Sequence, residues 1–586
     1  MNHKNLILIA GIIVIVIAYI FYIYRKGKEY EAADRNRKLN MEYGFIYQGI
    51  VEDLKSIIYQ KPEDLRVSYV EARKREEMSI KLSDAKRDAP VGSLSAKIYL
   101  TTQISKMLQT KYGVNEQTID QVFPFDDPEQ LDPHMRFLIL MITVMQEHGY
   151  DTWDYLQKKH ELDRLRENGR YEVYQSDIDQ LFSMYVNEHI PYMVKLDVFT
   201  QKIFEDSIGH GMPDIMMWQN IEDYSGGLGG IPAHDDNLMS YVDNMSDEKD
   251  CASYNKFVIL TNGKNLHLNF LGFGSQKELE RVCRHIYQYQ NPGEFSESVG
   301  FIENSMADGS RVVVFRAGFG DSWGFVVRKH RQGKLRTLAE MYLQKGCEKV
   351  QKLGEALMKG CQSCAITGPM YSGKTTLLTA LAEKINPNYN LRGLESVFEM
   401  GLRELFPDRD IGTFMERTDI PGDKVLEFLK RTNGTVLLLG ELLKEVAANW
   451  LISAGQSGFK FVMTTGHWNT TESMIKWLLN AKLNTSGSGD ADLAMLDIIQ
   501  ALHFDIHCGL DELKGERYLE RISEIVPTGD KRLYEIRDIL IYDIENKEYR
   551  LINSFSDRTW NDFKYYMSDE EIRNLKEMFE NDINAA

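Results

Sequence analysis

A short glycine-rich segment in the second half of the chain limits most strongly what this sequence can fold into. The segment GPMYSGKT fits the pattern G-x-x-x-x-G-K-[ST], with its fixed positions at Gly368, Gly373, Lys374 and Thr375. The apolar residues 364–367 before it predict a strand, and the leucine-rich residues after it predict an amphipathic helix. A strand, a glycine-rich turn and a helix in this order are typical of a parallel sheet. The sequence therefore predicts an α/β fold around this turn.

Each residue type in this pattern has a task in holding phosphate. Glycines let backbone N–H groups wrap a phosphate group, and the helix amino terminus adds its dipole to that anion site. Lys374 is expected to contact the β- and γ-phosphates, and the Thr375 hydroxyl to ligate Mg²⁺, which usually keeps several waters. Ser372 and Thr376 complete the predicted set. The segment therefore predicts a nucleotide-binding site.

Acidic residues follow two further predicted strands. The strand at 435–439 ends in Gly440-Glu441, and an acidic residue there can hold the water shell of a metal beside the phosphate loop. Glu395 and Glu399 stand four apart in LRGLESVFEM, and one of them could polarise an attacking water. The alternatives are a solvated helix start for Glu441 and a solvated helix face for the other two.

Charge and cysteine content exclude two broad classes of protein. The 586 residues carry 87 acidic and 69 basic side chains, a net charge of −18. Binding nucleic acid along the whole chain needs a surplus of lysine and arginine, so no direct contact with nucleic acid is expected. Six cysteines in a chain of this length exclude a disulfide scaffold.

A run of 19 residues without a charge, at 6–24, lies near the amino terminus. As a helix it would span about 28 Å, which matches the hydrocarbon core of a bilayer. The run ends in Tyr-Ile-Tyr and not in a small-residue cleavage site, so an uncleaved transmembrane helix is predicted, with a buried core helix as the alternative. Basic residues gather after the run, between Arg25 and Lys38, so the bulk of the chain is expected in the cytoplasm. The sequence thus predicts a single-pass protein of the inner or cytoplasmic membrane.

The length allows about four domains, and the chain after residue 24 divides by texture. Residues 25–93 are charge-dense and predict a stalk or linker, whereas residues 94–205 have the apolar spacing of a helical domain. Short strand-like runs mark residues 206–335, and alternating strands and helices mark residues 336–545. Residues 546–586 are predicted as a helical extension.

The order of these motifs resembles that of the type II and type IV secretion ATPases, with the CpaF-like ATPases of Tad-type pilus assembly as the nearest subgroup. Glu395, Glu399, Gly440-Glu441 and His467, in FVMTTGHWNTTESM, follow the phosphate loop in the family's order. The resemblance implies that Glu395 polarises the attacking water and that Glu441 belongs to the Walker B motif beside the metal. It also implies that His467 senses the γ-phosphate.

The same resemblance implies a role for two arginines. ADGSRVVVF and FVVRKH resemble stretches of the family's amino-terminal domain, which implies that Arg311 and Arg328 close over the nucleotide. Arg417 and Arg431 are candidates for arginine fingers toward a neighbouring subunit, with ordinary surface arginines as the alternative. The resemblance covers about residues 255–545 and leaves out the apolar run, the stalk and the helical domain.

The resemblance implies a PAS-like α+β domain followed by a RecA-like P-loop ATPase motor, with ATP and Mg²⁺ as cofactors. It further implies a homo-hexameric ring that acts on an inner-membrane platform protein. A transmembrane helix is unusual in this family, and here it would tether the ring close to that platform.

Three positions depart from the family's pattern. Tyr371 stands where a small residue is usual, Leu443 where an arginine is usual, and Gln456 where a histidine is usual. These departures affect turnover more than binding. The leading prediction is an ATPase that powers pilus assembly or secretion. A nucleotide-binding ring component with little turnover and a conjugation or DNA-uptake ATPase are the alternatives.

Overall fold

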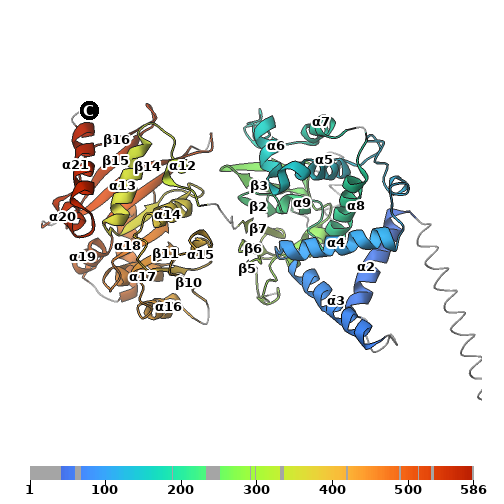
Figure 1. Ribbon diagram of the computed structural model, residues 1–586, viewed down its shortest axis with the longest axis horizontal. Helices are drawn as coiled ribbons and strands as arrows, with labels where there is room; N and C mark the ends of the chain where they lie inside the picture. Colours follow the sequence, from blue (N-terminus) through green and yellow to red (C-terminus); the bar gives the residue numbers. More distant parts are fainter. Residues whose placement is uncertain are drawn as a thin grey trace, which may run out of the picture. The chain divides into compact units, whose positions relative to one another are not determined.

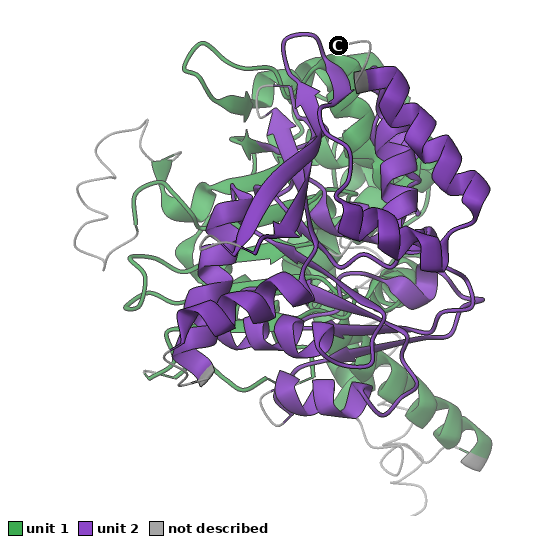
Figure 2. Cartoon of the chain, turned by 90° about the vertical axis from the view of Figure 1, so that its left-hand side faces the viewer, with its two compact units in different colours: residues 1–261, 265–329 green, residues 262–264, 330–586 purple. Residues whose placement is uncertain are grey.

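The computed structural model describes residues 41–59, 68–187, 189–232, 251–290, 292–296, 298–329, 335–417, 420–486, 490–511, 514–529 and 533–583. The chain divides into two compact units: unit 1 comprises residues 1–261 and 265–329, and unit 2 comprises residues 262–264 and 330–586 (Figure 2). The predicted transmembrane helix at 6–24 lies outside the described residues. Within those ranges, no helix is both long enough and apolar enough to cross a bilayer.

Unit 1 combines helices with a seven-stranded sheet of order β1-β4-β3-β2-β7-β6-β5 (Figure 1). Its strands are β1 (Tyr171–Val173), β2 (Asp223–Gly226), β3 (Phe257–Thr261), β4 (Lys264–Leu268), β5 (Phe301–Ser305), β6 (Arg311–Phe315) and β7 (Gly324–Arg328). Its helices are α2 (Tyr43–Tyr59), α3 (Tyr69–Asp88), α4 (Leu94–Thr110), α5 (Pro133–His148), α6 (Thr152–His160), α7 (Gln175–Tyr185), α8 (Tyr192–Ser207), α9 (Asp214–Met217) and α11 (Gln276–His285).

One hydrophobic core runs through unit 1, from α2 to β7. Helix α2 lies in the segment predicted as a stalk, and it buries Ile46, Ile50 and Leu54, which are spaced by four and therefore share one helix face. The charge-rich α3 contributes Leu82 and Ala85 to the same core. Strand β1, from the segment predicted as helical, pairs in parallel with β4. Long-range packing thus joins segments that differ in local texture.

Unit 2 is built on a nine-stranded sheet of order β10-β9-β11-β12-β8-β13-β14-β15-β16. The strands from β10 to β13 are parallel, and those from β14 to β16 are antiparallel. The strands are β8 (Cys364–Thr367), β9 (Leu391–Glu395), β10 (Ile411–Met415), β11 (Val436–Glu441), β12 (Phe461–Gly466), β13 (Phe504–Asp511), β14 (Glu516–Pro527), β15 (Tyr534–Asp543) and β16 (Glu548–Leu551). The α/β architecture predicted from the glycine-rich segment is therefore confirmed.

Helices cover both faces of this sheet. Along β11, Val436 and Leu438 belong to one core cluster while Leu437 and Leu439 belong to another, because successive side chains point to opposite faces. The helices are α12 (Leu338–Met341), α13 (Cys347–Lys359), α14 (Lys374–Glu383), α15 (Leu402–Leu405), α16 (Gly422–Leu429), α17 (Glu445–Gly455), α18 (Thr471–Ser486), α19 (Ala491–Ala501), α20 (Asp557–Tyr566) and α21 (Asp569–Ile583). A strand run buried on both faces is what a parallel sheet requires.

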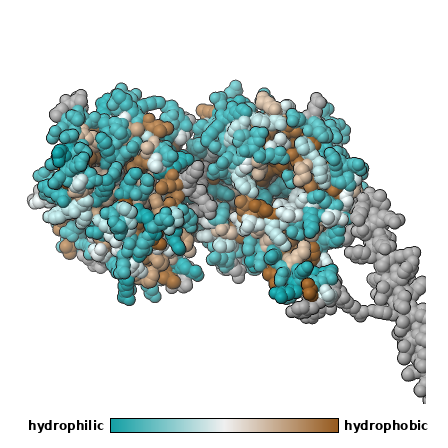
Figure 3. Space-filling view, viewed as in Figure 1, coloured by the Kyte–Doolittle hydropathy of each residue, from teal (hydrophilic) through white to brown (hydrophobic). Residues whose placement is uncertain are grey.

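The segment 546–586, predicted as a helical extension, begins with a strand and continues as two helices. β16 pairs with β15 and becomes the last strand of the sheet. Leu551, Phe555, Phe563 and Phe579 then belong to the same core cluster as Ile366 of β8. The end of the chain therefore stabilises the sheet that carries the phosphate loop. The outer surface in Figure 3 is largely hydrophilic, with apolar patches of limited size.

Candidate functional site

The carboxyl ends of four parallel strands in unit 2 bring most of the predicted site residues to one edge of the sheet. β9 ends in Glu395, β11 in Glu441, β12 directly before His467, and β8 directly before the glycine-rich loop. These strands are neighbours in the order β9-β11-β12-β8. In open α/β sheets, ligands bind beyond the carboxyl ends of the strands. The sheet order therefore places a phosphate loop, two carboxylates and a histidine where a nucleotide would bind.

Both fixed glycines of the loop have backbone conformations that other residues rarely adopt. Gly368 has φ 136° and Gly373 has φ 90°. A Cβ atom on Gly368 would lie 2.3 Å from the carbonyl oxygen of Cys508 in β13, which leaves no room for a side chain. Gly373 directly precedes α14, whose first residue is Lys374. The loop thus delivers the chain onto a helix amino terminus, which is a favourable place for an anion.

Tyr371, which stands where the resembling family has a small residue, adopts a left-handed conformation with φ 61°. A non-glycine residue in that region carries a cost on the order of 1 kcal/mol. Arg517 of β14 donates from Nε to the Tyr371 carbonyl oxygen at 2.7 Å, and the Ser372 hydroxyl donates to the Pro369 carbonyl oxygen at 2.8 Å. These bonds hold the loop in shape despite the bulkier residue.

Lys374, His467 and Glu441 form a connected chain of contacts. The buried Lys374 ammonium donates to the carbonyl oxygens of Gly368 at 3.1 Å and Pro369 at 2.7 Å, and it lies 3.1 Å from His467 Nδ1. An ammonium can only donate, so Nδ1 accepts and the imidazole carries its proton on Nε2. That Nε2 contacts the Glu441 carboxylate. The histidine therefore links the phosphate-loop lysine to the acidic residue of the neighbouring strand.

Glu395 is a buried residue at a strand end, with 2% of its surface exposed, so a solvated helix face is the wrong reading for it. Its Oε2 accepts backbone N–H bonds from Glu399 at 2.7 Å and Met400 at 2.9 Å. A Cβ on Gly440 would lie 3.3 Å from the Glu395 Cα, so the glycine allows β9 and β11 to approach closely here. Glu399 is half-buried in the turn that follows.

Thr375 and Thr376 follow Lys374 in the first turn of α14, where Thr375 is half-buried and Thr376 is exposed. No group of three or more His, Cys, Asp or Glu side chains in the described residues could hold a metal ion. At a phosphate loop, Mg²⁺ is usually held by substrate phosphates, waters and few protein oxygens. The Thr375 hydroxyl and the Glu441 carboxylate stay the predicted ligands of this ion.

The four predicted arginines have different places in the fold. Arg311 and Arg328 belong to β6 and β7 of unit 1, where they are directly opposite each other in the antiparallel ladder. The phosphate loop belongs to unit 2, so closure of the two arginines over a nucleotide stays a prediction. Arg431 is exposed and pairs with Glu427 at 2.6 Å on α16, as expected of a surface arginine. Arg417 follows β10 and exchanges backbone hydrogen bonds with Ile420.

Two positions that depart from the family's pattern have clear surroundings. Leu443, in the place of an arginine, is 54% exposed. Gln456, in the place of a histidine, donates from Nε2 to Asp497 Oδ1 at 2.6 Å. Neither makes a contact with the lysine–histidine–glutamate chain that the structure records.

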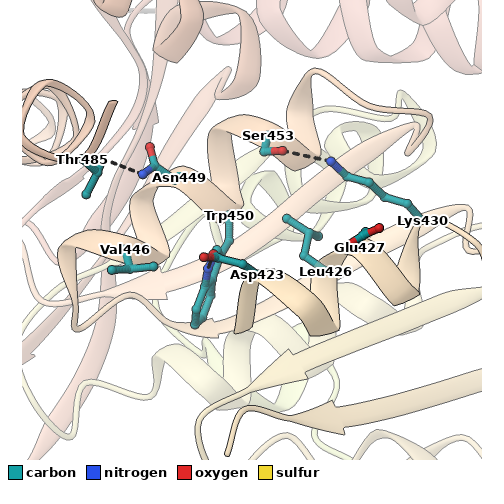
Figure 4. Close-up of a pocket in the computed structure, with 9 residues that line it drawn as sticks. All are labelled: Asp423, Leu426, Glu427, Lys430, Val446, Asn449, Trp450, Ser453 and Thr485. Atoms are coloured by element: carbon teal, nitrogen blue, oxygen red, sulfur yellow. Dashed lines mark hydrogen bonds between the residues drawn. The ribbon is translucent and has the colours of Figure 1, made fainter. Parts of the chain in front are cut away.

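A cavity of about 530 Å³ in unit 2 is separate from these residues (Figure 4). It lies among α16, α17 and α18, with Trp450 bonded to Asp423 and Lys430 bonded to Ser453. None of the predicted nucleotide-site residues is among its lining residues. This cavity is therefore not the predicted nucleotide site.

A buried polar cluster next to the loop was not predicted from the sequence. Thr367, Asp505, His507 and Thr471 are all almost fully buried and are joined by hydrogen bonds. The available signal was the strand FDIHCGL, in which Asp505 and His507 stand two apart and so share one face of an otherwise apolar run. The role of Arg517 was not predicted either, because its partner Tyr371 lies 146 residues away in the sequence.

Burial gives His507 a pH-dependent effect on stability. Burial, aided by Arg521 and Lys374, lowers the pKa of His507 from 6.5 to about 4. Because the unfolded chain then binds the proton first, stability present above pH 6.5 is lost as the pH falls toward 4. We expect the free energy of unfolding to fall by about 2 kcal/mol between pH 7 and pH 5 because of this histidine.

Urea denaturation at the two pH values measures this loss. An asparagine in place of the histidine keeps an N–H near the position of Nδ1 and does not titrate, so His507→Asn should lose correspondingly less stability between pH 7 and pH 5. An equal loss in both proteins would contradict the assignment.

A comparison with known proteins finds similarity in the part of the chain that contains the phosphate loop. Residues 323–503 match the family model described as type II/IV secretion system protein (T2SSE). Similar solved structures include the VirB11 ATPase of the Brucella suis type IV secretion system in complex with sulphate, at 14% identity over 52% of this chain and 91% of that chain, with a TM-score of 0.26. They also include the Legionella pneumophila ATPase DotB, at 16% identity over 61% and 83%, with a TM-score of 0.34.

A third similar structure is the pilus retraction motor PilT with bound ADP, at 14% identity over 61% of this chain and 86% of that chain, with a TM-score of 0.33. No curated protein matches the chain. The family match spans the phosphate loop, Glu395, Glu441 and His467, which are the residues that meet at the sheet edge. Residues 323–503 are therefore similar to the type II/IV secretion system protein family.

Proposed function

We propose that this chain is an ATPase whose hydrolysis of ATP powers pilus assembly or protein secretion. The observation that carries the proposal is the contact chain from Lys374 through His467 to Glu441, next to the buried Glu395, inside a segment that matches the family. A phosphate-binding loop alone indicates binding. A carboxylate on each of two neighbouring strands adds the groups that hydrolysis needs.

The roles follow from position. Lys374 and the backbone N–H groups of the loop bind the β- and γ-phosphates, and Thr375 and Glu441 would hold Mg²⁺. Bound Mg²⁺ neutralises charge on the phosphates. Glu395 accepts the proton of the attacking water through the carboxylate oxygen that the turn does not use. His467, with its proton on Nε2, contacts both Lys374 and Glu441, so a shift of Lys374 on phosphate binding also shifts Glu441.

The assembly is part of the proposal. We infer a CpaF-like hexameric ring in which Arg311 and Arg328 close over the nucleotide bound in unit 2, and in which an inner-membrane platform protein receives the motion. The apolar run at 6–24 would anchor the ring in the inner membrane. These inferences rest on the resemblance of the motifs and on the family match.

A second candidate is a nucleotide-binding ring component with little turnover. It is favoured by the two backbone N–H bonds to Glu395 Oε2, which stabilise the charged form of that carboxylate, and by exposed Leu443 in the place of an arginine. Phosphate release by the purified full-length protein separates the two candidates. The motor requires release well above that of Lys374→Ala, and ATP binding without such release would leave only the ring component.

A further inference from the structure

A buried carboxylate lies next to both of the loops that carry Lys374 and His467. Asp505 of β13 has none of its surface exposed. Its Oδ1 accepts from the hydroxyl of Thr367 at 2.5 Å, and its Oδ2 accepts from the hydroxyl of Thr471 at 2.7 Å. Thr367 directly precedes Gly368 of the phosphate loop, and Thr471 begins α18 four residues after His467. One side chain therefore holds the start of one loop and the end of the other.

The direction of each hydrogen bond around Thr367 is fixed by chemistry. The Thr367 hydroxyl gives its one proton to the carboxylate, so it accepts from His507 Nδ1, which lies 2.7 Å away. Arg521 fixes the other loop at a second point, since Nη2 donates to the Asn469 carbonyl oxygen at 3.2 Å and lies 3.7 Å from Asp505 Oδ2. The two loops are thus joined in two places. One is Asp505, which contacts Thr367 and Thr471, and the other is the contact of Lys374 with His467.

A requirement of packing alone does not explain a carboxylate in this place. Burial raises the pKa of Asp505, since the charged form loses its hydration, and an apolar residue of similar volume would avoid that cost. The carboxylate does what an apolar residue cannot do, because it accepts from two hydroxyls that belong to different loops. A displacement of one loop therefore changes the hydrogen bond that holds the other.

We propose that Asp505 is a positioning residue that couples the phosphate loop to the His467 loop, so that nucleotide bound at Lys374 orders His467 and Glu441. The proposal rests on the proposed function in one respect, since it requires that nucleotide binds at the phosphate loop. Asp505 itself touches neither the nucleotide phosphates nor the attacking water in this role.

Thr471→Val tests the coupling most cleanly, because valine matches threonine in shape and removes only the hydroxyl on the His467 side. We expect turnover per folded molecule to fall about tenfold, while ATP affinity stays within about twofold of wild type. Thr471→Ser restores the hydroxyl and should restore turnover. Thr485→Val removes a hydroxyl at the other end of α18 and serves as the matched control, with turnover unchanged.

Asp505→Asn should act on the same step. With Thr471→Val already present, Asp505→Asn should lower turnover by less than it does alone, because the two changes break the same contact. Full additivity of the two effects would overturn the coupling. Turnover of Thr471→Val at the wild-type level, or a loss that Thr471→Ser does not restore or that Thr485→Val reproduces, would overturn it as well.

Hydrogen–deuterium exchange of the full-length protein with and without ADP decides the coupling without any need for turnover. In the wild type, ADP should slow exchange in the phosphate loop and also in residues 467–470. In Thr471→Val, the slowing should remain in the phosphate loop and be lost from residues 467–470. Equal slowing of both loops in the variant would overturn the proposal. A wild type that releases no more phosphate than Lys374→Ala removes the motor function and leaves this test in force.

Discussion

Glu395→Gln is expected to lower ATP turnover by about 10²- to 10⁴-fold and to leave ATP affinity within about threefold of wild type. The amide oxygen of glutamine can keep the bonds from the Glu399 and Met400 N–H groups, which both go to Oε2. The amide nitrogen then replaces the oxygen that would take the proton from water. The change therefore removes the base while it keeps the turn after β9, and phosphate release together with ATP titration measures both effects.

Glu399→Gln is the matched control for this substitution. Its side chain is half-buried in the same turn, and its backbone N–H donates to Glu395 Oε2. We expect turnover of Glu399→Gln to stay within about threefold of wild type. A fall in Glu399→Gln as large as that in Glu395→Gln would place the base on the wrong carboxylate, and unchanged turnover in Glu395→Gln would remove its role altogether.

Lys374→Ala is expected to weaken ATP binding by about 10²-fold or more, because charge-assisted bonds to two phosphates are lost. The substitution also removes the contact to His467 Nδ1, so the histidine loses the partner that fixes its tautomer. Calorimetric titration with ATP and Mg²⁺ measures the affinity. Lys384→Ala, at the carboxyl end of the same helix α14 and paired with Glu383, removes an equal charge away from the loop and should leave the affinity unchanged. Equal affinities of Lys374→Ala and Lys384→Ala would contradict the site.

The parts of this site that the sequence predicted are those that depend on neighbours along the chain. The strand at 364–367, the turn and the helix are consecutive, so the glycine spacing alone predicts them. Glu441 ends a run of apolar residues, which places it at a strand end without any knowledge of the sheet. The α/β class followed from the same local patterns.

The parts that the sequence did not predict depend on which strands pair. Asp505 reaches Thr367 over 138 positions only because β13 pairs with β8, and periodicity carries no information about that pairing. Helix α3 looks like part of a solvated stalk because most of its residues are charged or polar, and its few buried apolar residues join the core of unit 1. Tyr371 stands out in the sequence only because it departs from a family pattern, and its hydrogen bond with Arg517, 146 residues away, cannot be predicted without the fold.

The sheet order separates the residue expected to bind the nucleotide from the residue expected to hydrolyse it. Lys374 follows β8 and Glu395 ends β9, and β11 and β12 lie between them. In evolutionary terms, the two properties can therefore be inherited independently. One base change in a glutamate codon gives glutamine at position 395. A lineage with that change would keep a protein that is expected to bind ATP without hydrolysing it. The same sheet could thus supply a motor in one genome and a nucleotide-sensing scaffold in another.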